Sequence, residues 1–380
     1  MSHLPLTGLV VLEFSQYLSG PSAGLRLADL GARVIKIERP QGGDAGRKLA
    51  IKNLWAGDDS LLFHTINRNK ESFTADLKDP ADLLIVKKII EKADVLTHNF
   101  RPGIMEKVGL DYASVKGINP RLVYAEISGY GKEGPWKNKP GQDLLLQAVT
   151  GLAYTTGNAT DAPVPFGLSI ADSLCGAQMV QGILAALIRR QKTNQGTLVS
   201  MSLMESLLDF QFEFLTTYYN SKQDIKRSQV NNGNPMLGAP YGIYQTANGY
   251  IAIAMMDIHV LGTAVDCCEL LQYAQKNVFV DRDEIKGILN HHLQLQPTKY
   301  WLEKLQAKDL WAMEVLDWNM MVATEAYQKL QMEQVVTAAN GQQITTTTCP
   351  IRINGQKLFA SKAAPALGAN NSNITKEFIK

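Results

Sequence analysis

A long apolar segment with a carboxylate at its start constrains the fold of this chain more than any other feature. Almost every residue of the segment 174–188 is apolar, and Gln178 and Gln181 are its main interruptions. A helix that is apolar on nearly all of its faces belongs in a protein interior. Asp172 stands directly before this segment, so we expect a carboxylate in the first turn of a buried helix.

Two interpretations of Asp172 are open, and they are compatible. Ser169 precedes it by three residues, which is the spacing of a capping box in which both side chains bind backbone N–H groups. A first-turn carboxylate is also kept ionised by the helix dipole, and an ionised, partly desolvated carboxylate is a usable nucleophile. Spacing by itself favours the cap. The helix is expected to stop at Asn194 and Gly196, which are typical residues of a helix C-terminus.

Composition places the chain among soluble globular proteins. It has 380 residues, 45% of them hydrophobic and 19% charged, which is enough for two or three domains. A net charge of +2 argues against a nucleic-acid partner. We recognise no signal peptide and no run of roughly 18 apolar residues, so we expect a cytoplasmic protein that does not enter a membrane. Free thiols are expected at the four cysteines, Cys175, Cys267, Cys268 and Cys349.

The N-terminal residues have the pattern of a βαβ unit. Segments 8–14 and 32–38 are short, apolar and β-branched, and segment 23–30 between them has helical periodicity. Such a unit implies parallel strands with a right-handed crossover. Gly42-Gly43 follows the second strand, where it cannot serve as a dinucleotide fingerprint, so a nicotinamide cofactor is not supported.

The alternation of strands and helices continues along the chain. Further strands are expected at 94–98, 121–129 and 197–201, and further helices at 79–93, 142–150 and 205–219. Residues 222–240 are the best candidate for a domain boundary. Beyond them we expect a β-hairpin at 241–255, helices over most of 259–334, β structure at 334–352 and a largely irregular tail from 363. The fold class is therefore α/β. The histidines share no ligand spacing with acidic neighbours, so no metal site is expected.

Several stretches together resemble the family III CoA transferases, the group that contains formyl-CoA transferase and carnitine CoA-transferase. The resemblance runs from about residue 5 to 260 and again, weakly, near 350–368. It rests on the order and spacing of five segments, namely 20–21, 30–38, 69–78, 93–110 and 171–196.

The resemblance implies a reaction at Asp172. In this family the aspartate in that position attacks an acyl-CoA thioester to form a mixed anhydride, and the released CoA thiolate then forms an aspartyl-CoA thioester. A carboxylic acid takes the CoA in the second half of the cycle. CoA and acyl-CoA are thus substrates, and no permanently bound cofactor is implied.

The resemblance also implies a CoA site, carried over position by position. Arg39 and Lys107 match basic residues near the nucleotide and phosphates, and Asn99 and Phe100 match a pair that lines the path of the pantetheine arm. The full set is Tyr17, Leu18, Arg39, Ala75, Asn99, Phe100, Lys107 and Lys139. Lys139 is carried over because it adjoins Pro140, which stands where the family has a lysine.

Departures from the family's patterns bear on the substrate. Formyl-CoA transferases have glutamine at the position of Leu18, which weakens a formyl or oxalate assignment. Racemases acting on 2-methylacyl-CoA share the fold but have histidine at the position of Gln142, and glutamine cannot exchange the α-proton. A racemase and a non-catalytic CoA-binding homologue remain the alternatives to a transferase. The acyl donor, the acceptor acid and the role of the divergent region 300–380 stay open.

By resemblance we expect a large α/β domain with an open, Rossmann-like parallel sheet, and a smaller α+β domain. The large domain is predicted over 1–225 and is completed by 330–380, whereas the small domain is predicted over 226–329. The family forms interlocked homodimers, and the aromatic helix expected at 205–219 would suit such an interface.

Overall fold

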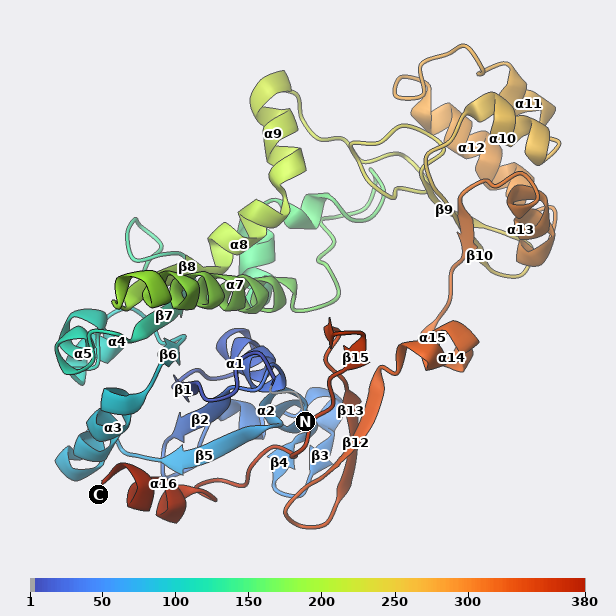
Figure 1. Cartoon of the computed structure of the whole chain (residues 1–380). Helices are drawn as coiled ribbons and strands as arrows, with labels where there is room; N and C mark the ends of the chain where they lie inside the picture. The colour runs from blue at the N-terminus through green and yellow to red at the C-terminus, as the bar shows by residue number, and fades with distance from the viewer. Residues whose placement is uncertain (1–3, 380) are drawn as a thin grey trace. The chain divides into compact units, whose positions relative to one another are not determined.

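The computed structural model describes residues 4–379, and the chain forms two compact units (Figure 1). The larger unit comprises Met1–Leu146, Ser169–Phe210 and Ala326–Lys380, and the smaller comprises Gln147–Leu168 and Gln211–Glu325. Segments 147–168 and 211–225 therefore group with the smaller unit. The domain limits expected from the sequence stay a prediction.

A six-stranded parallel sheet is the centre of the larger unit. Its order is β5-β2-β1-β6-β7-β8, and every adjacent pair is parallel. The strands are β1 (Val10–Glu13), β2 (Arg33–Glu38), β5 (Lys70–Thr74), β6 (Val95–His98), β7 (Val123–Ser128) and β8 (Thr197–Ser202). The order reverses between β1 and β6, and in open sheets of this kind ligands bind beyond the carboxyl ends of the strands at such a reversal. The expected α/β class with an open parallel sheet is confirmed.

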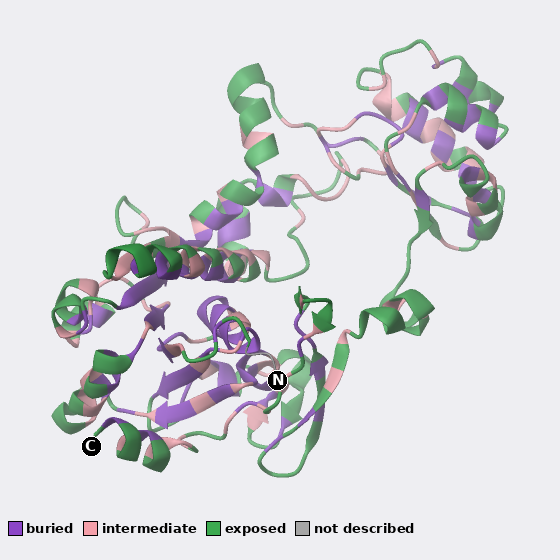
Figure 2. Ribbon diagram, viewed as in Figure 1, coloured by how far each residue is buried: buried purple, intermediate pink, exposed green. Residues whose placement is uncertain are grey.

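Helices cover both faces of this sheet. On one face α1 (Ser19–Asp29) packs closely against α7 (Ile170–Thr193). On the other, α3 (Pro80–Lys92) and α5 (Tyr112–Ile118) contribute to an apolar core that includes Leu12, Ile35 and Leu96 of the sheet. Strands β1, β2, β6 and β7 are the most deeply buried strands of this unit (Figure 2).

The C-terminal tail is not irregular, contrary to the sequence expectation. It forms α16 (Asn371–Phe378), which places Ile374 and Phe378 in the core beside α3. Residues at the start of the helix bind edge strand β5, since the Asn370 N–H donates to the Ser72 carbonyl and the Thr74 N–H donates to Asn371 Oδ1. Two apolar residues four positions apart are too weak a pattern to predict a helix, and here tertiary packing decides.

The central helix α7 differs partly from its expected burial. Cys175, Met179 and Ile183 are buried, but the opposite face of the helix, which includes Ile188, is exposed in the single chain (Figure 2). The helix ends as predicted at Asn194, which is in the left-handed conformation. Its length and composition would allow it to cross a membrane, but this is weak evidence because core helices of soluble proteins have the same properties.

Three other boundaries differ from the sequence expectation. Helix α1 begins at Ser19 and includes Gly20-Pro21, because proline is tolerated in a first helical turn. The helix expected at 205–219 is two helices, α8 (Leu203–Phe210) and α9 (Phe212–Ser221), interrupted at Gln211. The structure also contains strand β5 and helix α2 (Leu61–Asn67), which the sequence pattern does not predict as separate elements.

Shorter elements complete the larger unit. They are the 3-10 helices η1 (Ala45–Lys48) and η2 (Ile51–Asn53), helices α4 (Ile104–Lys107) and α6 (Asp143–Val149, which runs into the smaller unit), and strands β3 (Trp55–Ala56), β4 (Asp59–Ser60), β12 (Glu333–Thr337), β13 (Gln343–Thr347), β14 (Arg352–Ile353) and β15 (Gln356–Lys357). The expected β structure at 334–352 corresponds to the antiparallel pair β12–β13.

The smaller unit has its own core around a three-stranded antiparallel sheet. The order is β11-β10-β9, with β9 (Gly242–Gln245), β10 (Tyr250–Ile253) and β11 (Ala312–Glu314), and the predicted hairpin is formed by β9 and β10. Tyr244, Leu289 and Trp301 belong to its buried core. Its remaining helices are η3 (Leu152–Tyr154), α10 (Ile258–Ala264), α11 (Cys268–Leu271), α12 (Arg282–Leu293), α13 (Thr298–Gln306) and α14 (Trp318–Ala323), and α15 (Glu325–Leu330) lies at its limit.

Candidate active site

A buried ionic cluster supports the carboxyl ends of β1 and β2. Lys36 lies 2.9 Å from Glu13 and 2.8 Å from Asp44, and all three side chains are almost fully buried. The Lys36 ammonium also donates to the Ser15 carbonyl at 2.7 Å. Buried charges of this kind are tolerated only when they are paired and hydrogen-bonded, so the cluster ties the start of the loop after β1 to strand β2.

The loop after β1 is held at three successive residues. Beyond the Ser15 carbonyl, the Gln16 N–H donates to Asn99 Oδ1 at 2.8 Å and Asn99 Nδ2 donates to the Gln16 carbonyl at 2.7 Å. The Tyr17 N–H donates to Asp44 Oδ1 at 3.1 Å. Tyr17 has a φ of 63°, a left-handed conformation that is uncommon outside glycine and asparagine, and its side chain is 52% exposed. The loop therefore presents the tyrosine ring to solvent from a fixed backbone.

Strand register brings most of the predicted CoA residues to one edge of the sheet. Glu13 pairs with Thr97, so the loops carrying Tyr17 and Asn99 adjoin at the point where strand order reverses. Likewise Glu38 pairs with Thr74, so the residues that follow, Arg39 and Ala75, come from neighbouring strand ends. The predicted CoA residues in the segments that follow the carboxyl ends of these four strands are Tyr17, Leu18, Arg39, Ala75, Asn99 and Phe100.

These residues differ in exposure. Arg39 is exposed, and its guanidinium donates only weakly placed hydrogen bonds, 3.3 to 3.4 Å long, to the Gly43 carbonyl. Ala75 is buried, and its N–H donates to the Glu38 carbonyl. Phe100 is partly buried and stacks on His98.

The two predicted lysines lie outside this group of contacts. Lys107 is exposed at the end of α4, and Lys139 is exposed in the loop between β7 and α6. The Lys139 ammonium lies 5.3 Å from the ring centre of Trp136. Within residues 4–379, no hydrogen bond or ion pair joins either lysine to the other predicted CoA residues.

Asp172 is in the first turn of α7, as predicted, but the expected capping box is wrong. Ser169 is the N-cap residue, and its side chain makes no capping hydrogen bond. Instead the Asp172 N–H donates to Asp143 Oδ2 at 3.1 Å, so a carboxylate from α6 binds the first turn of α7. The capping function is thus supplied from a distant segment, which leaves the Asp172 carboxylate itself available for other contacts.

The surroundings of Asp172 favour the protonated form more than water does. Burial of the carboxylate, followed by the charge of Asp143, raises its pKa to about 6. Hydrogen bonds from the Ser19 hydroxyl and backbone N–H act in the opposite direction. Ser19 is the first residue of α1, so the positive end of a second helix dipole also faces Asp172. At neutral pH the carboxylate is ionised but close to its titration range.

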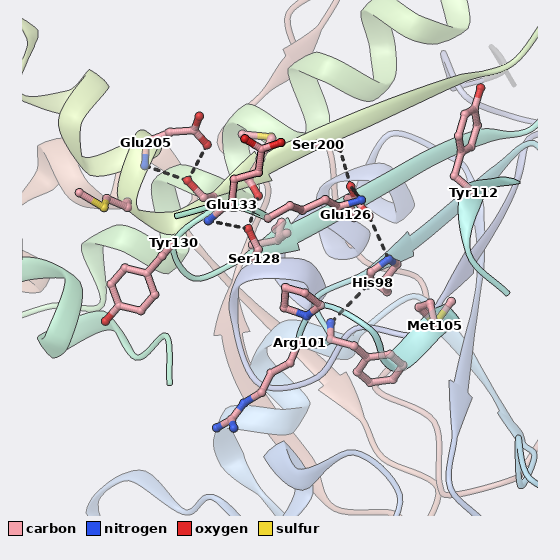
Figure 3. A pocket seen from close by; sticks show the side chains of 18 of the residues that line it. His98, Arg101, Met105, Tyr112, Glu126, Ser128, Tyr130, Glu133, Ser200 and Glu205 are labelled. Carbon is pink, nitrogen blue, oxygen red and sulfur yellow. Dashed lines mark hydrogen bonds and ion pairs between the residues drawn. The ribbon is translucent and has the colours of Figure 1, made fainter. Parts of the chain in front are cut away.

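A cavity of about 520 Å³ lies beside the ends of β6, β7 and β8 (Figure 3). Among the predicted CoA residues Phe100 lines it, and Arg101, Tyr130 and Glu205 lie around it. Asp172 does not line it. The backbone connects this cavity to the surroundings of Asp172. Gly129, directly after β7, lies so close to Gly141 that a Cβ atom on Gly129 would be 2.8 Å from the Gly141 Cα. Gly141 is two residues before Asp143, which binds the first turn of α7.

One wall of the cavity carries a cluster of charges on β6 and β7. Glu126 accepts a hydrogen bond from Ser200 Oγ at 2.5 Å and pairs with Lys132 at 2.5 Å, and His98 Nε2 lies 3.6 Å from its other oxygen (Figure 3). Burial tends to raise the pKa of Glu126, but hydrogen bonds from His98, Lys132 and Ser200 lower it to about 2. This carboxylate therefore stays ionised and engaged at neutral pH.

Sequence reasoning missed three residues that shape the site. Ser19 contacts the Asp172 side chain. Asp44 accepts a hydrogen bond from the Tyr17 N–H, and Asp143 accepts one from the Asp172 N–H. Asp143 did show one signal, an acidic residue at the start of a predicted helix. The sequence could not show that this first turn faces that of α7, 29 residues away.

Comparison with known proteins agrees with this architecture. The sequence profile described as CoA-transferase family III matches residues 6–371. An acetyl-CoA:oxalate CoA-transferase of Acetobacter aceti is 31% identical over 98% of this chain and 96% of its own length. A human succinyl-CoA:glutarate CoA-transferase is 28% identical over 99% of this chain and 86% of its own length.

Solved structures show the same fold. A protein of the CaiB/BaiF family from Brucella suis superposes with a TM-score of 0.84 at 28% sequence identity. The match covers 99% of this chain and 100% of the other. The likeness therefore extends to both compact units.

Proposed function

The chain belongs to CoA-transferase family III and is a CoA-transferase, and from that premise we propose that it moves CoA from an acyl-CoA to a carboxylic acid through Asp172. The observation that carries this proposal is the position of the Asp172 carboxylate. It lies in the first turn of α7, is contacted by the first residue of α1 and is ionised at neutral pH. It is partly desolvated without being sealed off, as a nucleophile requires.

The proposed reaction proceeds in four exchanges. An Asp172 oxygen attacks the thioester carbonyl, and the C–S bond breaks to give a mixed anhydride and CoA thiolate. The thiolate attacks the aspartyl carbonyl of that anhydride, releasing the donor acid and leaving an aspartyl-CoA thioester. The acceptor carboxylate then displaces CoA thiolate to form a second anhydride, and the thiolate takes the acceptor's acyl group, which restores Asp172. No net proton is consumed.

Each exchange passes through a tetrahedral oxyanion. The backbone N–H of Ser19, the first residue of α1, contacts the Asp172 carboxylate and is suited to stabilise this charge. Mutations that remove one such donor in other enzymes slow catalysis by roughly 100- to 1,000-fold. We assign an oxyanion donor to the Ser19 N–H.

The CoA site is proposed at the carboxyl ends of β5, β2, β1 and β6. Arg39 is suited to a phosphate group because its guanidinium is exposed and only weakly engaged. Asn99 and Phe100 line the proposed pantetheine path, with Tyr17 and Leu18 opposite on the adjoining loop. Lys107 and Lys139 are further phosphate candidates on exposed segments, and Ala75 is proposed to meet the adenine.

We also propose a homodimer, interlocked as in the family. The exposed face of α7, with Ile188 60% exposed, and the exposed aromatic residues of α9, including Phe212 and Tyr219, support a covering partner. Light scattering coupled to gel filtration should give twice the mass of one chain. A single-chain mass at micromolar protein would contradict this proposal without touching the chemistry at Asp172.

The proposed nucleophile is tested by trapping. The enzyme is incubated with acetyl-CoA or succinyl-CoA, quenched with hydroxylamine or borohydride, and digested for mass spectrometry. We expect modification confined to Asp172, and transfer of CoA to an added dicarboxylic acid. Asp172→Asn should form no adduct, whereas Asp161→Asn, at an exposed carboxylate, is the control and should react like the wild type.

The outcomes separate the alternatives. CoA transfer without any adduct on Asp172 would contradict the aspartyl intermediate. CoA binding without transfer or adduct across donors of different chain length would favour a CoA-binding protein. Exchange of the α-proton of a 2-methylacyl-CoA, measured in deuterated water, would favour a racemase.

A further inference from the structure

The close approach of α1 and α7 sets the position of Ser19 relative to Asp172. A Cβ atom on Gly176 would lie 2.7 Å from the Ser19 carbonyl oxygen and 2.2 Å from Ser22 Oγ. Only glycine allows this distance between the helices, because real Cβ atoms do not approach other atoms so closely. Gly176 lies one helical turn after Asp172, so the buried first residue of α1 is held against the turn that carries the nucleophile.

Asn99 defines the orientation of the Ser19 hydroxyl. The two hydrogen bonds to the Gln16 backbone fix which end of the Asn99 amide is the oxygen and which is the nitrogen. The same nitrogen donates to Ser19 Oγ at 3.3 Å. Since the Ser19 oxygen accepts from Asn99, its own hydrogen is available for another acceptor, and the Asp172 carboxylate interacts with this hydroxyl.

We propose that Ser19 is a positioning residue for Asp172, and that Asn99 positions Ser19. The hydroxyl holds the carboxylate in one orientation for attack on the thioester and stabilises its ionised form. This inference rests on the proposed nucleophilic role of Asp172. It adds two residues to that role, and Asn99 thereby serves the nucleophile as well as the CoA path.

The neighbouring carboxylate opposes the ionisation that this donor favours. Asp143 from α6 is a second carboxylate and disfavours ionisation. Cys175 lies one turn along α7, where burial raises the pKa of its thiol to about 12, so it adds no charge at neutral pH. Glu205 from α8 is near Cys175 and is another negative group. Ser19 and the first turn of α1 thus oppose an otherwise acidic environment.

The test follows the rate of Asp172 adduct formation from acetyl-CoA between pH 5 and 9. Ser19→Ala removes a hydrogen bond to a charged group, so we expect the midpoint of the acid limb to rise from about 6 by about one unit, and the rate at pH 6 to fall about fivefold. The rate should largely recover at pH 9. Ser19→Gly also lacks the hydroxyl and should show the same shift.

A matched control is available on the same helix. Ser22 also packs against Gly176, but its hydroxyl donates to the Ser19 carbonyl at 2.8 Å. Ser22→Ala should therefore keep the wild-type midpoint. Asn99→Ala should shift the midpoint in the same direction as Ser19→Ala, in addition to any loss of CoA affinity.

The possible results are distinct. A wild-type midpoint in both Ser19 variants would overturn the inference while Asp172 labelling still stands. An unshifted midpoint in Asn99→Ala would overturn the role given to Asn99. Absence of any Asp172 adduct in the wild-type enzyme would overturn the proposed function, and this inference with it.

Discussion

At the scale of single residues, the site consists of charges placed where their ionisation is costly. Asp172 shares the first turn of α7 with the carboxylate of Asp143, whose oxygen binds the Asp172 backbone N–H. One aspartate therefore caps the helix and the other is left with a raised pKa. Such a division of labour between two carboxylates is a common way to prepare one of them for chemistry.

The raised pKa of Asp172 makes a prediction about stability. In the unfolded chain this carboxyl has a pKa near 3.8, and in the folded protein about 6, so ionisation penalises the folded state as pH rises through this window. Asp172→Asn removes the penalty. We expect the variant to match the wild type near pH 3.5 and to exceed it at pH 7 by up to about 3 kcal/mol. Urea unfolding at both pH values measures the difference.

The control for this effect is a carboxylate on the surface. Asp58 is exposed, and Asp58→Asn should leave the difference between the two pH values as in the wild type. If Asp172→Asn also shows no gain at pH 7, burial and Asp143 do not destabilise the ionised carboxylate as the structure implies.

The ionic cluster beneath the Tyr17 loop makes a second prediction at this scale. Lys36→Met leaves Asp44 without a cation in the protein interior, whereas Glu13 keeps its pair with Lys70. Removing one partner of a buried pair typically costs about 3–5 kcal/mol, so a large loss of stability is expected in denaturant unfolding. Lys88→Met breaks an exposed pair with Glu91 and should cost less than about 1 kcal/mol. Equal losses in the two variants would contradict the structural role of the cluster.

At the scale of elements, the contact between α1 and α7 builds the site. Helix α7 brings Asp172, α1 brings Ser19, and Gly176 allows the two to meet. Alanine is normally preferred over glycine within a helix. This glycine is therefore required by the neighbouring helix and not by the conformation of its own.

Gly176→Ala tests that requirement. Its new methyl group would overlap the Ser19 carbonyl and Ser22 hydroxyl, so α1 and α7 must separate. We expect a loss of about 1–3 kcal/mol in stability and a marked loss of transferase activity. Gly117→Ala in α5, where the methyl group meets open space, is the matched control and should be neutral or slightly stabilising. An active, stable Gly176→Ala enzyme would show that the helices need not be this close.

At the scale of the whole molecule, the C-terminal segment packs against the edge of the parallel sheet that the N-terminal segments form. Residues 368–371 bind β5, and Arg33 of β2 pairs with Glu377 of α16 at 2.7 Å. This contact covers an edge strand that would otherwise expose unpaired backbone groups. The larger unit is therefore complete only when the last helix has docked.

Phe378→Ala tests how much the docking of α16 contributes to stability. The ring is 3% exposed in the core beside α3, and its loss should cost about 3–5 kcal/mol. Lys376→Ala, on the exposed side of the same helix, should change stability by less than about 0.5 kcal/mol. Hydrogen exchange at β5 should increase in the Phe378 variant. Unchanged protection there would mean that the edge strand does not depend on α16.

The sequence by itself determined the elements whose signals are local. The alternation of β-branched strands with periodic helices predicted the parallel sheet, and Asn194 marked the end of α7 because a left-handed residue ends a helix wherever it stands. The position of Asp172 in a first turn is local in the same sense. These features depend on residues a few positions apart, so one chain is enough to recognise them.

Only the tertiary structure shows which side chains from distant segments contact one another. The Asp143 cap on α7, the contact of Ser19 with Asp172 and the docking of α16 link residues 29, 153 and about 300 positions apart, and none has a sequence spacing that predicts it. The predicted Ser169–Asp172 capping box is wrong for this reason, because the Asp172 N–H donates to the Asp143 carboxylate of α6 and not to Ser169. Side chains compete for partners in three dimensions, and the sequence order does not record which partner is nearest.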